Sequence, residues 1–138
     1  MDSAPDHSKD ATRQLARLII ASRFEDLPES VRHEAKRTLL NWVGCAIGGS
    51  GHKTVNNAIA ALLPFCGPGQ ASLFGRREHV DILHASLLNG ISSHVFDFDD
   101  THAATAIHPA APVAPAILAL AEHQPISGRD FILSLIHI

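Results

Sequence analysis

The sequence contains 138 residues, of which 46% are hydrophobic and 18% charged, and its formal net charge is −3. This length and apolar content fit one globular domain and exclude a disordered or collagen-like chain. The acidic balance and the lack of a lysine–arginine run predict that nucleic acid is not a partner.

The N-terminal residues and the cysteines predict a cytoplasmic protein. The start of the chain is polar and lacks the apolar segment of a secretion signal, and prolines interrupt the least charged stretch, so no membrane span is expected. Cys45 and Cys66 have no metal-type spacing. We expect both to be free thiols, as is usual in a reducing compartment.

Two helices are predicted in the N-terminal third, after a flexible leader at residues 1–9. Apolar residues at helical spacing predict an amphipathic helix from about 10 to 22. A longer helix is predicted from the first-turn proline Pro28 to Gly48-Gly49. Its apolar face includes Trp42, which we expect in the core rather than stacked on a ligand.

The middle of the chain is predicted to contain two further helices and a short extended piece. Thr54 is expected to cap a helix that ends near Pro64. Residues 71–74 are the expected extended piece. Asp81 is expected to cap the next helix, which Asn89-Gly90 would bend or interrupt.

The last third is predicted to be helical and largely buried. Residues 101–128 contain a single charged side chain, Glu122, which favours a buried helix at 113–121. Ser127 and Asp130 have the spacing of a capping box and predict one more helix after them.

These elements predict an all-α fold with helix-on-helix packing, similar to a helical bundle, and at most one short extended segment. We expect residues 10–138 to form one helical domain. Because the chain stops inside an apolar helix, we also expect that domain to be truncated.

The segment HVFDFDDTHAATAIHP, residues 94–109, concentrates ionisable groups between two apolar stretches. It holds three aspartates and three histidines, namely Asp97, Asp99, Asp100, His94, His102 and His108. A solvated acidic turn is the simplest interpretation of such a run, but its apolar flanks make full solvation difficult. Buried carboxylates need partners, so the segment is a candidate functional site.

One interpretation of this segment is a metal site, because carboxylates suit Mg²⁺ and imidazoles suit Zn²⁺. Asp97, Asp99 and Thr101 also fit the DxDxT pattern of Mg-dependent haloacid-dehalogenase-like phosphohydrolases. That chemistry requires a buried parallel strand directly before Asp97, and the preceding residues do not have a strand pattern.

The other interpretation is metal-free acid–base chemistry on a small carboxylic acid. A carboxylate or a histidine can move a proton near neutral pH, and a threonine hydroxyl can orient a substrate carboxylate. If residues 97–101 are helical, Asp97 and Thr101 share one face by their i,i+4 spacing. His108 would then approach from the loop that Pro109 stiffens.

The stretch LLNGISSHVFDFDDTHAATAIHPAAPVAPAILALAE resembles the MmgE/PrpD family, which includes 2-methylcitrate dehydratase and cis-aconitate decarboxylase. The matching signals are Asn-Gly, then His, then DFDDT, then His-Pro. VRHEAKRTLLNWVGCAIGGS is similar to the second helix of that family and ASLFGR to its short extended piece. The resemblance covers roughly residues 11–131.

The resemblance implies a cytosolic lyase without a metal or organic cofactor, built from a large helical domain and a smaller α/β lid, and usually homodimeric. Substrates in the family are small polycarboxylates, and we favour a 2-methylcitrate dehydratase-like activity. The catalytic residues of the family fall on Asp97, Thr101 and His108. The gap between Thr101 and His108 differs by one residue between members, so His108 is placed through its His-Pro pair.

Other residues of the segment are expected to bind substrate or to support the catalytic groups: Asn89, His94, Asp99, Asp100 and His102. His94 would hydrogen-bond Asp97 if the backbone there were helical, and Asp99 and Asp100 would orient neighbours or cap the following helix.

The resemblance also implies that part of the site is missing. The substrate-binding lysines and a further histidine of the family lie downstream of this chain, as does the lid domain. We therefore expect the 138-residue chain to be inactive by itself. A non-catalytic helical interaction fragment is the remaining alternative.

Overall fold

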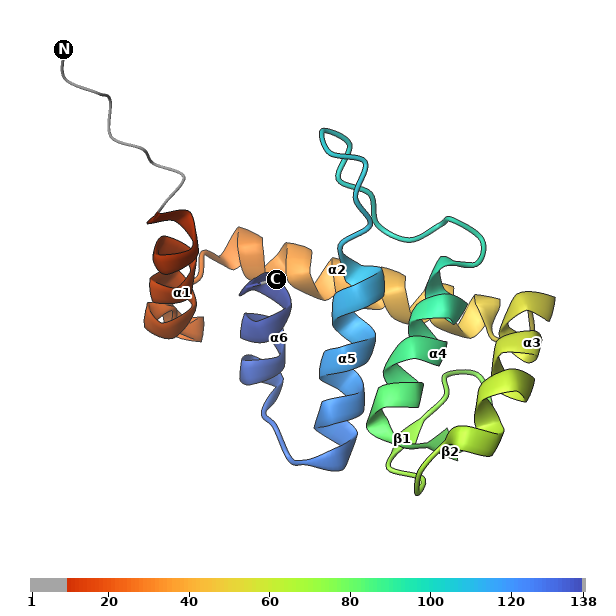
Figure 1. The fold of residues 1–138 in the computed structure, drawn as a ribbon. Coiled ribbons are helices and arrows are strands. Elements are labelled where there is room, and N and C mark those ends of the chain that lie inside the picture. Colours follow the sequence, from red (N-terminus) through yellow and green to blue (C-terminus); the bar gives the residue numbers. More distant parts are fainter. Residues whose placement is uncertain (1–9, 138) are drawn as a thin grey trace, which may run out of the picture.

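A computed structural model describes residues 10–137 (Figure 1). The expected leader at 1–9 lies outside the described residues. Within them the elements in chain order are α1 (Ala11–Ala21), a 3-10 turn (Phe24–Asp26), α2 (Glu29–Gly49), α3 (Lys53–Leu62), a 3-10 turn (Leu63–Phe65), β1 (Ala71–Ser72), β2 (His79–Val80), α4 (Ile82–His94), α5 (Ala110–His123) and α6 (Gly128–His137). The predicted helical fold is confirmed.

The two N-terminal helices form where the apolar spacing predicts them. α2 begins directly after Pro28, which occupies the N-cap position. Trp42 of α2 is fully buried, and its ring meets Phe74 edge-to-face at 5.4 Å between centroids. Its predicted place in the core is confirmed.

The cap of α3 differs from the prediction. His52 is the N-cap residue, and its Nδ1 accepts a hydrogen bond from the backbone N–H of Thr54 at 3.2 Å. Thr54 therefore lies inside the first turn of the helix. An imidazole with an unprotonated Nδ1 replaces the usual hydroxyl or carboxylate acceptor at the cap.

The predicted extended piece is one of two short strands. β1 pairs with β2 in an antiparallel sheet, with Ala71 opposite Val80 and Ser72 opposite His79. The sequence pattern did not indicate β2, because a strand of two residues is too short to show alternation.

Of the two features predicted for helix α4, the cap at Asp81 is present and the bend at Asn89-Gly90 is not. Asp81 caps its N-terminus as expected, accepting the N–H groups of Leu83 and His84. The helix then runs through Asn89 and Gly90 without interruption. A Cβ at Gly90 would lie 3.2 Å from the carbonyl oxygen of Ala111. Gly90 therefore permits close packing of α4 against α5 instead of forming a bend.

The helices are arranged so that the loop between α4 and α5 lies at one end of this helix pair. Figure 1 shows α4, α5 and α6 side by side, running up, down and up, with the long α2 crossing all three. The C-terminus of α4 and the N-terminus of α5 therefore lie at the same end. The loop at residues 95–109 joins them and projects from the layer as a hairpin.

Two apolar clusters stabilise this arrangement, and α5 contributes to both. The first joins α2, α5 and α6 around Trp42, Ile117 and Phe131. The second joins α3, the two strands and α4 around Val55 and Leu88, and Ala119 of α5 completes it. Buried apolar side chains on both sides fix the position of α5, and with it the start of the helix next to the loop.

The fold excludes one alternative from the sequence. A helix and a turn precede Asp97, because α4 ends at His94 and Val95 and Phe96 are in a turn, and the only sheet in residues 10–137 is antiparallel. The parallel strand required by a haloacid-dehalogenase-like phosphohydrolase is not there. None of the helices described is both long and apolar enough to span a membrane.

Candidate active site

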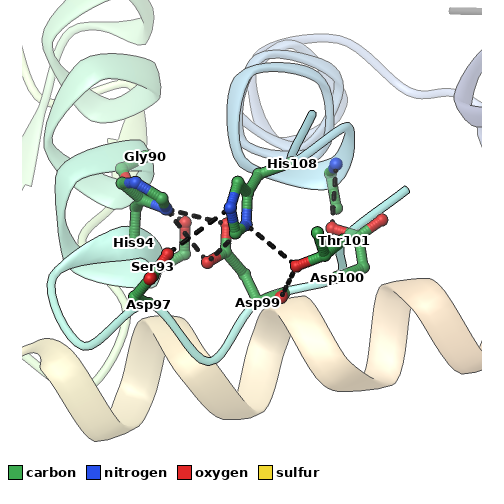
Figure 2. A network of polar contacts seen from close by, with 9 residues as sticks. Gly90, Ser93, His94, Asp97, Asp99, Asp100, Thr101 and His108 are labelled. Atoms are coloured by element: carbon green, nitrogen blue, oxygen red, sulfur yellow. Dashed lines mark hydrogen bonds and ion pairs between the residues drawn. The ribbon is translucent and has the colours of Figure 1, made fainter. Parts of the chain in front are cut away.

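The candidate site lies in the loop between α4 and α5 (Figure 2). Helix α4 ends at His94, and the backbone N–H of Asp97 returns a hydrogen bond to the His94 carbonyl at 2.9 Å. Asp97 has a φ of 58°, in the left-handed region that aspartate tolerates better than most residues. The ring of Phe96 in this turn contacts His52, the N-cap residue of α3, edge-to-face at 5.2 Å between centroids.

Residues 97–101 are therefore not helical, and the expected i,i+4 pairing of Asp97 with Thr101 is wrong. The expected hydrogen bond from His94 to the carboxylate of Asp97 is also replaced. The left-handed residue ends the helix and redirects the chain, so that Asp99 reaches His94 instead.

Asp99 is the buried centre of the site. Its side chain has no exposed surface. Nδ1 of His94 lies 3.0 and 3.1 Å from its two carboxylate oxygens, and Nδ1 of His108 lies 3.3 Å from its Oδ1. Both neighbours are imidazoles, which approach from α4 and from the end of the loop.

His108 links this buried carboxylate to the exposed Asp97. Nε2 of His108 lies 3.4 Å from Oδ1 of Asp97, whose side chain is 75% exposed. The hydroxyl of Thr101 lies 3.5 Å from Nδ1 of His108. Figure 2 shows His108 between the two aspartates and Thr101, so the three residues predicted to be catalytic lie together.

A hairpin brings Thr101 and His108 together across seven positions of sequence. The backbone N–H of His102 donates to the carbonyl of Ile107 at 2.8 Å, which closes the base of the hairpin. Ala106 near its tip has a φ of 53°. The separation of the two site residues is therefore set by one backbone bridge rather than by the residues between them.

Asp100 caps α5, one of the roles that the sequence suggested for it. Its Oδ1 accepts the N–H of Ala110, the first residue of the helix, at 3.1 Å. Burial raises the pKa of Asp100, the hydrogen bond from Ala110 lowers it, and the nearby charge of Asp99 raises it further. The net shift is upward.

Two of the predicted supporting residues lie away from this cluster. Asn89 is buried on α4, where its amide accepts from the N–H of Phe74 and donates to the carbonyl of Ser72, both at 2.9 Å. It thereby fastens the β1 segment to α4. His102 is exposed on the hairpin, and its Nδ1 pairs with the hydroxyl of Thr105 at 2.7 Å.

Helix α2 also lies beside the site, which the sequence did not indicate. Burial, together with the charges of Asp99 and Asp100, raises the pKa of the Cys45 thiol on α2. A cavity of about 380 Å³ lies between α2 and the loop, lined in part by Cys45, Ser93 and Phe98. A second, more open groove of about 580 Å³ runs between α4 and α5 beside His94. Nothing in the spacing of Cys45 signals its place on this side of the site.

Four donor groups lie close enough to be considered as metal ligands: His94, Asp97, Asp99 and His108 approach within 4.8 Å of one another. However, His108 turns Nε2 to Asp97 and Nδ1 to Asp99. The two nitrogens of one imidazole point in different directions, so a single ion cannot replace both contacts. The arrangement as it stands is a chain of alternating carboxylates and imidazoles, suited to holding and moving protons.

Comparison with known proteins agrees with the motif. A family model described as the MmgE/PrpD N-terminal domain matches residues 13–137. "Cis-aconitate decarboxylase-like protein oryM" of Aspergillus oryzae is 29% identical over 98% of the chain, which corresponds to 29% of that relative. The cis-aconitate decarboxylases of Mus musculus and Homo sapiens are 28% and 29% identical over 91% of the chain and 27% of their own length.

The chain therefore spans less than a third of the length of these curated relatives. The family model, by contrast, covers nearly all of the described residues, including both helices and the loop that form the site. On this evidence the chain belongs to the MmgE/PrpD family and corresponds to its N-terminal domain.

Proposed function

We propose that this chain supplies Asp97, Thr101 and His108 to the active site of a lyase that acts on a small di- or tricarboxylic acid. The observation that carries the proposal is the contact of His108 with Asp97 at 3.4 Å, with the hydroxyl of Thr101 at 3.5 Å. A base, an acid and a hydrogen-bonding hydroxyl are thereby gathered where one of the carboxylates is open to a ligand.

These groups suit the elimination chemistry of such acids. In dehydration, a base removes the proton next to a carboxylate, the C–O bond breaks, and an acid protonates the leaving hydroxyl to give water. In decarboxylation, the electrons of the broken C–C bond stay on the substrate carbon, which then takes a proton from an acid. Asp97 and His108 are suited to these two proton transfers, and Thr101 to holding a substrate carboxylate.

Among substrates, we rank a cis-aconitate-like tricarboxylate and decarboxylation first, because the relatives above carry that name. A 2-methylcitrate dehydratase-like reaction, favoured from the motif alone, ranks second. Both substrates are polyanions. The recorded ion pairs of the described site are between carboxylates and histidines. We therefore expect cationic groups for the substrate to come from another part of the complete protein.

The experiment is an assay of the complete encoded protein with each substrate separately, measuring release of CO₂ from cis-aconitate and loss of water from 2-methylcitrate. Asp97→Asn and His108→Gln should each lower kcat by at least about 100-fold, the usual contribution of general acid–base catalysis. Asp26→Asn, an exposed aspartate outside the site, is the matched control and should retain activity. Turnover of neither acid, or full activity in both site variants, would contradict the proposal.

A further inference from the structure

The residue that organises the site is the buried Asp99 rather than the exposed Asp97. We propose that Asp99 is a positioning residue that fixes the proton of both neighbouring imidazoles, His94 and His108, on Nδ1. Its catalytic consequence rests on the function proposed above, but the protonation pattern itself does not.

The first step of the argument is the direction of the contacts. An ionised carboxylate can only accept hydrogen bonds. Both imidazoles turn Nδ1 towards Asp99, at 3.0 Å for His94 and 3.3 Å for His108. A ring nitrogen facing a carboxylate at this distance is favoured when it carries the proton, so the neutral form of each ring keeps its hydrogen on Nδ1.

The second step is burial. The side chain of Asp99 is fully buried, whereas the side chain of His94 is 50% exposed and that of His108 is 24% exposed. A carboxylate removed from water needs hydrogen-bond donors, and the recorded side-chain contacts of Asp99 are with these two rings. Both rings are therefore held from the buried side, and the free lone pair of each lies on Nε2.

The third step concerns the surroundings of Nε2 in His108. This nitrogen faces the carboxylate of Asp97 at 3.4 Å, and this carboxylate is 75% exposed, so water can supply its hydrogen-bond donors. The fully buried Asp99 has no such supply, so the single proton of the neutral ring goes to Nδ1, on the side of Asp99. The other titratable groups around His108 are Asp100 from the same loop and His94 from α4, whose ring lies 4.8 Å away edge-to-face. On α2, burial and the charges of Asp99 and Asp100 raise the pKa of the Cys45 thiol. A neutral His108 with its proton on Nδ1 presents a basic nitrogen to the open side, as a carboxylate-oriented catalytic histidine does.

The competing explanation is that Asp99 only packs the loop. The two explanations differ for Asp99→Asn, which keeps the shape of the side chain. The amide replaces one acceptor oxygen by a nitrogen that can only donate. Because both carboxylate oxygens of Asp99 lie within 3.1 Å of Nδ1 of His94, this nitrogen faces an imidazole in either orientation of the amide. The ring that it faces must accept at its Nδ1 and move its own proton to Nε2. A packing role predicts no such exchange.

The test uses nitrogen NMR spectra of the complete protein labelled in its histidines, recorded where the rings are neutral, with His94 and His108 assigned by their single substitutions. In the unaltered protein both rings should carry the proton on Nδ1. In Asp99→Asn one of the two should change to the Nε2–H form. Asp81→Asn is the matched control, because Asp81 pairs with Nδ1 of His84 at 2.6 Å and should affect that ring alone.

An Nε2–H form of either ring in the unaltered protein would overturn the proposal even if Asp99→Asn failed to fold. So would a folded Asp99→Asn variant with both rings unchanged. In the activity assay, Asp99→Asn should lower kcat by about 100-fold or more, with KM changed less than about threefold, because it disturbs proton transfer and leaves Thr101 in place. If the protein turned over neither acid but showed the predicted protonation, the proposed function would fail and the positioning role of Asp99 would stand.

Discussion

The two ends of α4 each hold an aspartate–histidine pair, and they differ in what surrounds the carboxylate. At the N-terminal end, Asp81 pairs with His84 at 2.6 Å and also accepts the backbone N–H groups of Gly67, Leu83 and His84. These backbone donors, with that of Gly67 first, hold the pKa of Asp81 well below its usual range. At the C-terminal end, the recorded side-chain contacts of Asp99 are with imidazoles.

This difference separates a structural carboxylate from a candidate catalytic one. Backbone N–H groups do not exchange protons with a carboxylate near neutral pH, and three of them hold Asp81 besides His84, so we expect Asp81 mainly to stabilise the fold. Imidazoles gain and lose protons near neutral pH, so a carboxylate shared between them can take part in proton movement. We therefore expect substitutions at the N-terminal end of α4 to affect stability, and substitutions at the C-terminal end to affect activity.

The largest effect on stability is expected from a substitution that pushes the C-terminal end of α4, next to the site, away from α2. A Cβ at Gly49 would lie 2.0 Å from the backbone oxygen of Ser92 and 2.8 Å from Val95. Gly49→Ala should lower the free energy of unfolding by about 3 kcal/mol, at the upper end of overpacking costs, because a backbone carbonyl cannot move without its helix. Denaturant unfolding measures the change.

The neighbouring glycine provides the matched control for this prediction. A Cβ at Gly48 would meet nothing within 4 Å. Gly48→Ala should therefore stabilise the protein by about 0.5–1 kcal/mol through helix propensity alone. Equal effects of the two substitutions would show that α4 does not lie this close to α2.

The next effect should appear in substrate binding without loss of stability. Thr101→Val keeps the shape of the side chain and removes the hydroxyl that lies beside His108. If this hydroxyl holds a substrate carboxylate, KM should rise by about 10-fold or more, as expected for a lost hydrogen bond to a charged group. Thr101→Ser should restore most of the binding. A fall in kcat with unchanged KM would instead place Thr101 in the proton-transfer step.

At the N-terminal end of α4 we expect a substitution to lower stability and to leave activity nearly unchanged. Asp81→Asn keeps one capping oxygen but cannot replace the second carboxylate oxygen, so the melting temperature should fall by a few degrees while kcat stays within about twofold. Because folding lowers the pKa of Asp81, its contribution is present above the unfolded-state pKa of about 3.9 and is lost as the pH falls. The difference between the two proteins should therefore shrink below about pH 4, which thermal melts over a pH series would test.

Asp100 should give the smallest effect, and one of opposite sign. Because the pKa of Asp100 is raised mainly by burial, its ionised form costs stability as the pH rises through that pKa. Asp100→Asn removes the charge and keeps an acceptor for the N–H of Ala110. The melting temperature at pH 7 should rise by about 1–2 °C, and the gain should vanish below about pH 4. A fall in melting temperature at pH 7 would mean that the charge is needed for the cap.

The sequence was most informative where local signals decide the structure. Apolar spacing was sufficient for α2, whose buried positions include Ala35, Trp42 and Ala46. The cap at Asp81 was predictable for the same reason, since aspartate before an apolar run is a local signal. Ser127 likewise accepts the N–H of Asp130 as a capping residue would.

Prediction from the sequence failed where contacts between distant segments determine the local structure. Asn89-Gly90 has the local signature of a bend, but close contact with Ala111 of α5 keeps it helical. Asp97, Thr101 and His108, which the family resemblance singled out, do lie together, and their catalytic roles stay predictions. The i,i+4 argument for two of them did not hold, because the left-handed backbone at Asp97 ends the helix. The burial of Asp99 depends on how α4, α5 and the loop pack, and no spacing reveals it.

The hairpin between Thr101 and His108 has a practical consequence. Because the bridge between His102 and Ile107 closes its base, the residues beyond that bridge are exposed and do not set the distance between the two site residues. Chain length at the tip can therefore vary over evolution without altering the reacting groups. The same tip is a suitable insertion point for a small label or reporter peptide that reads out events in the site from a few residues away.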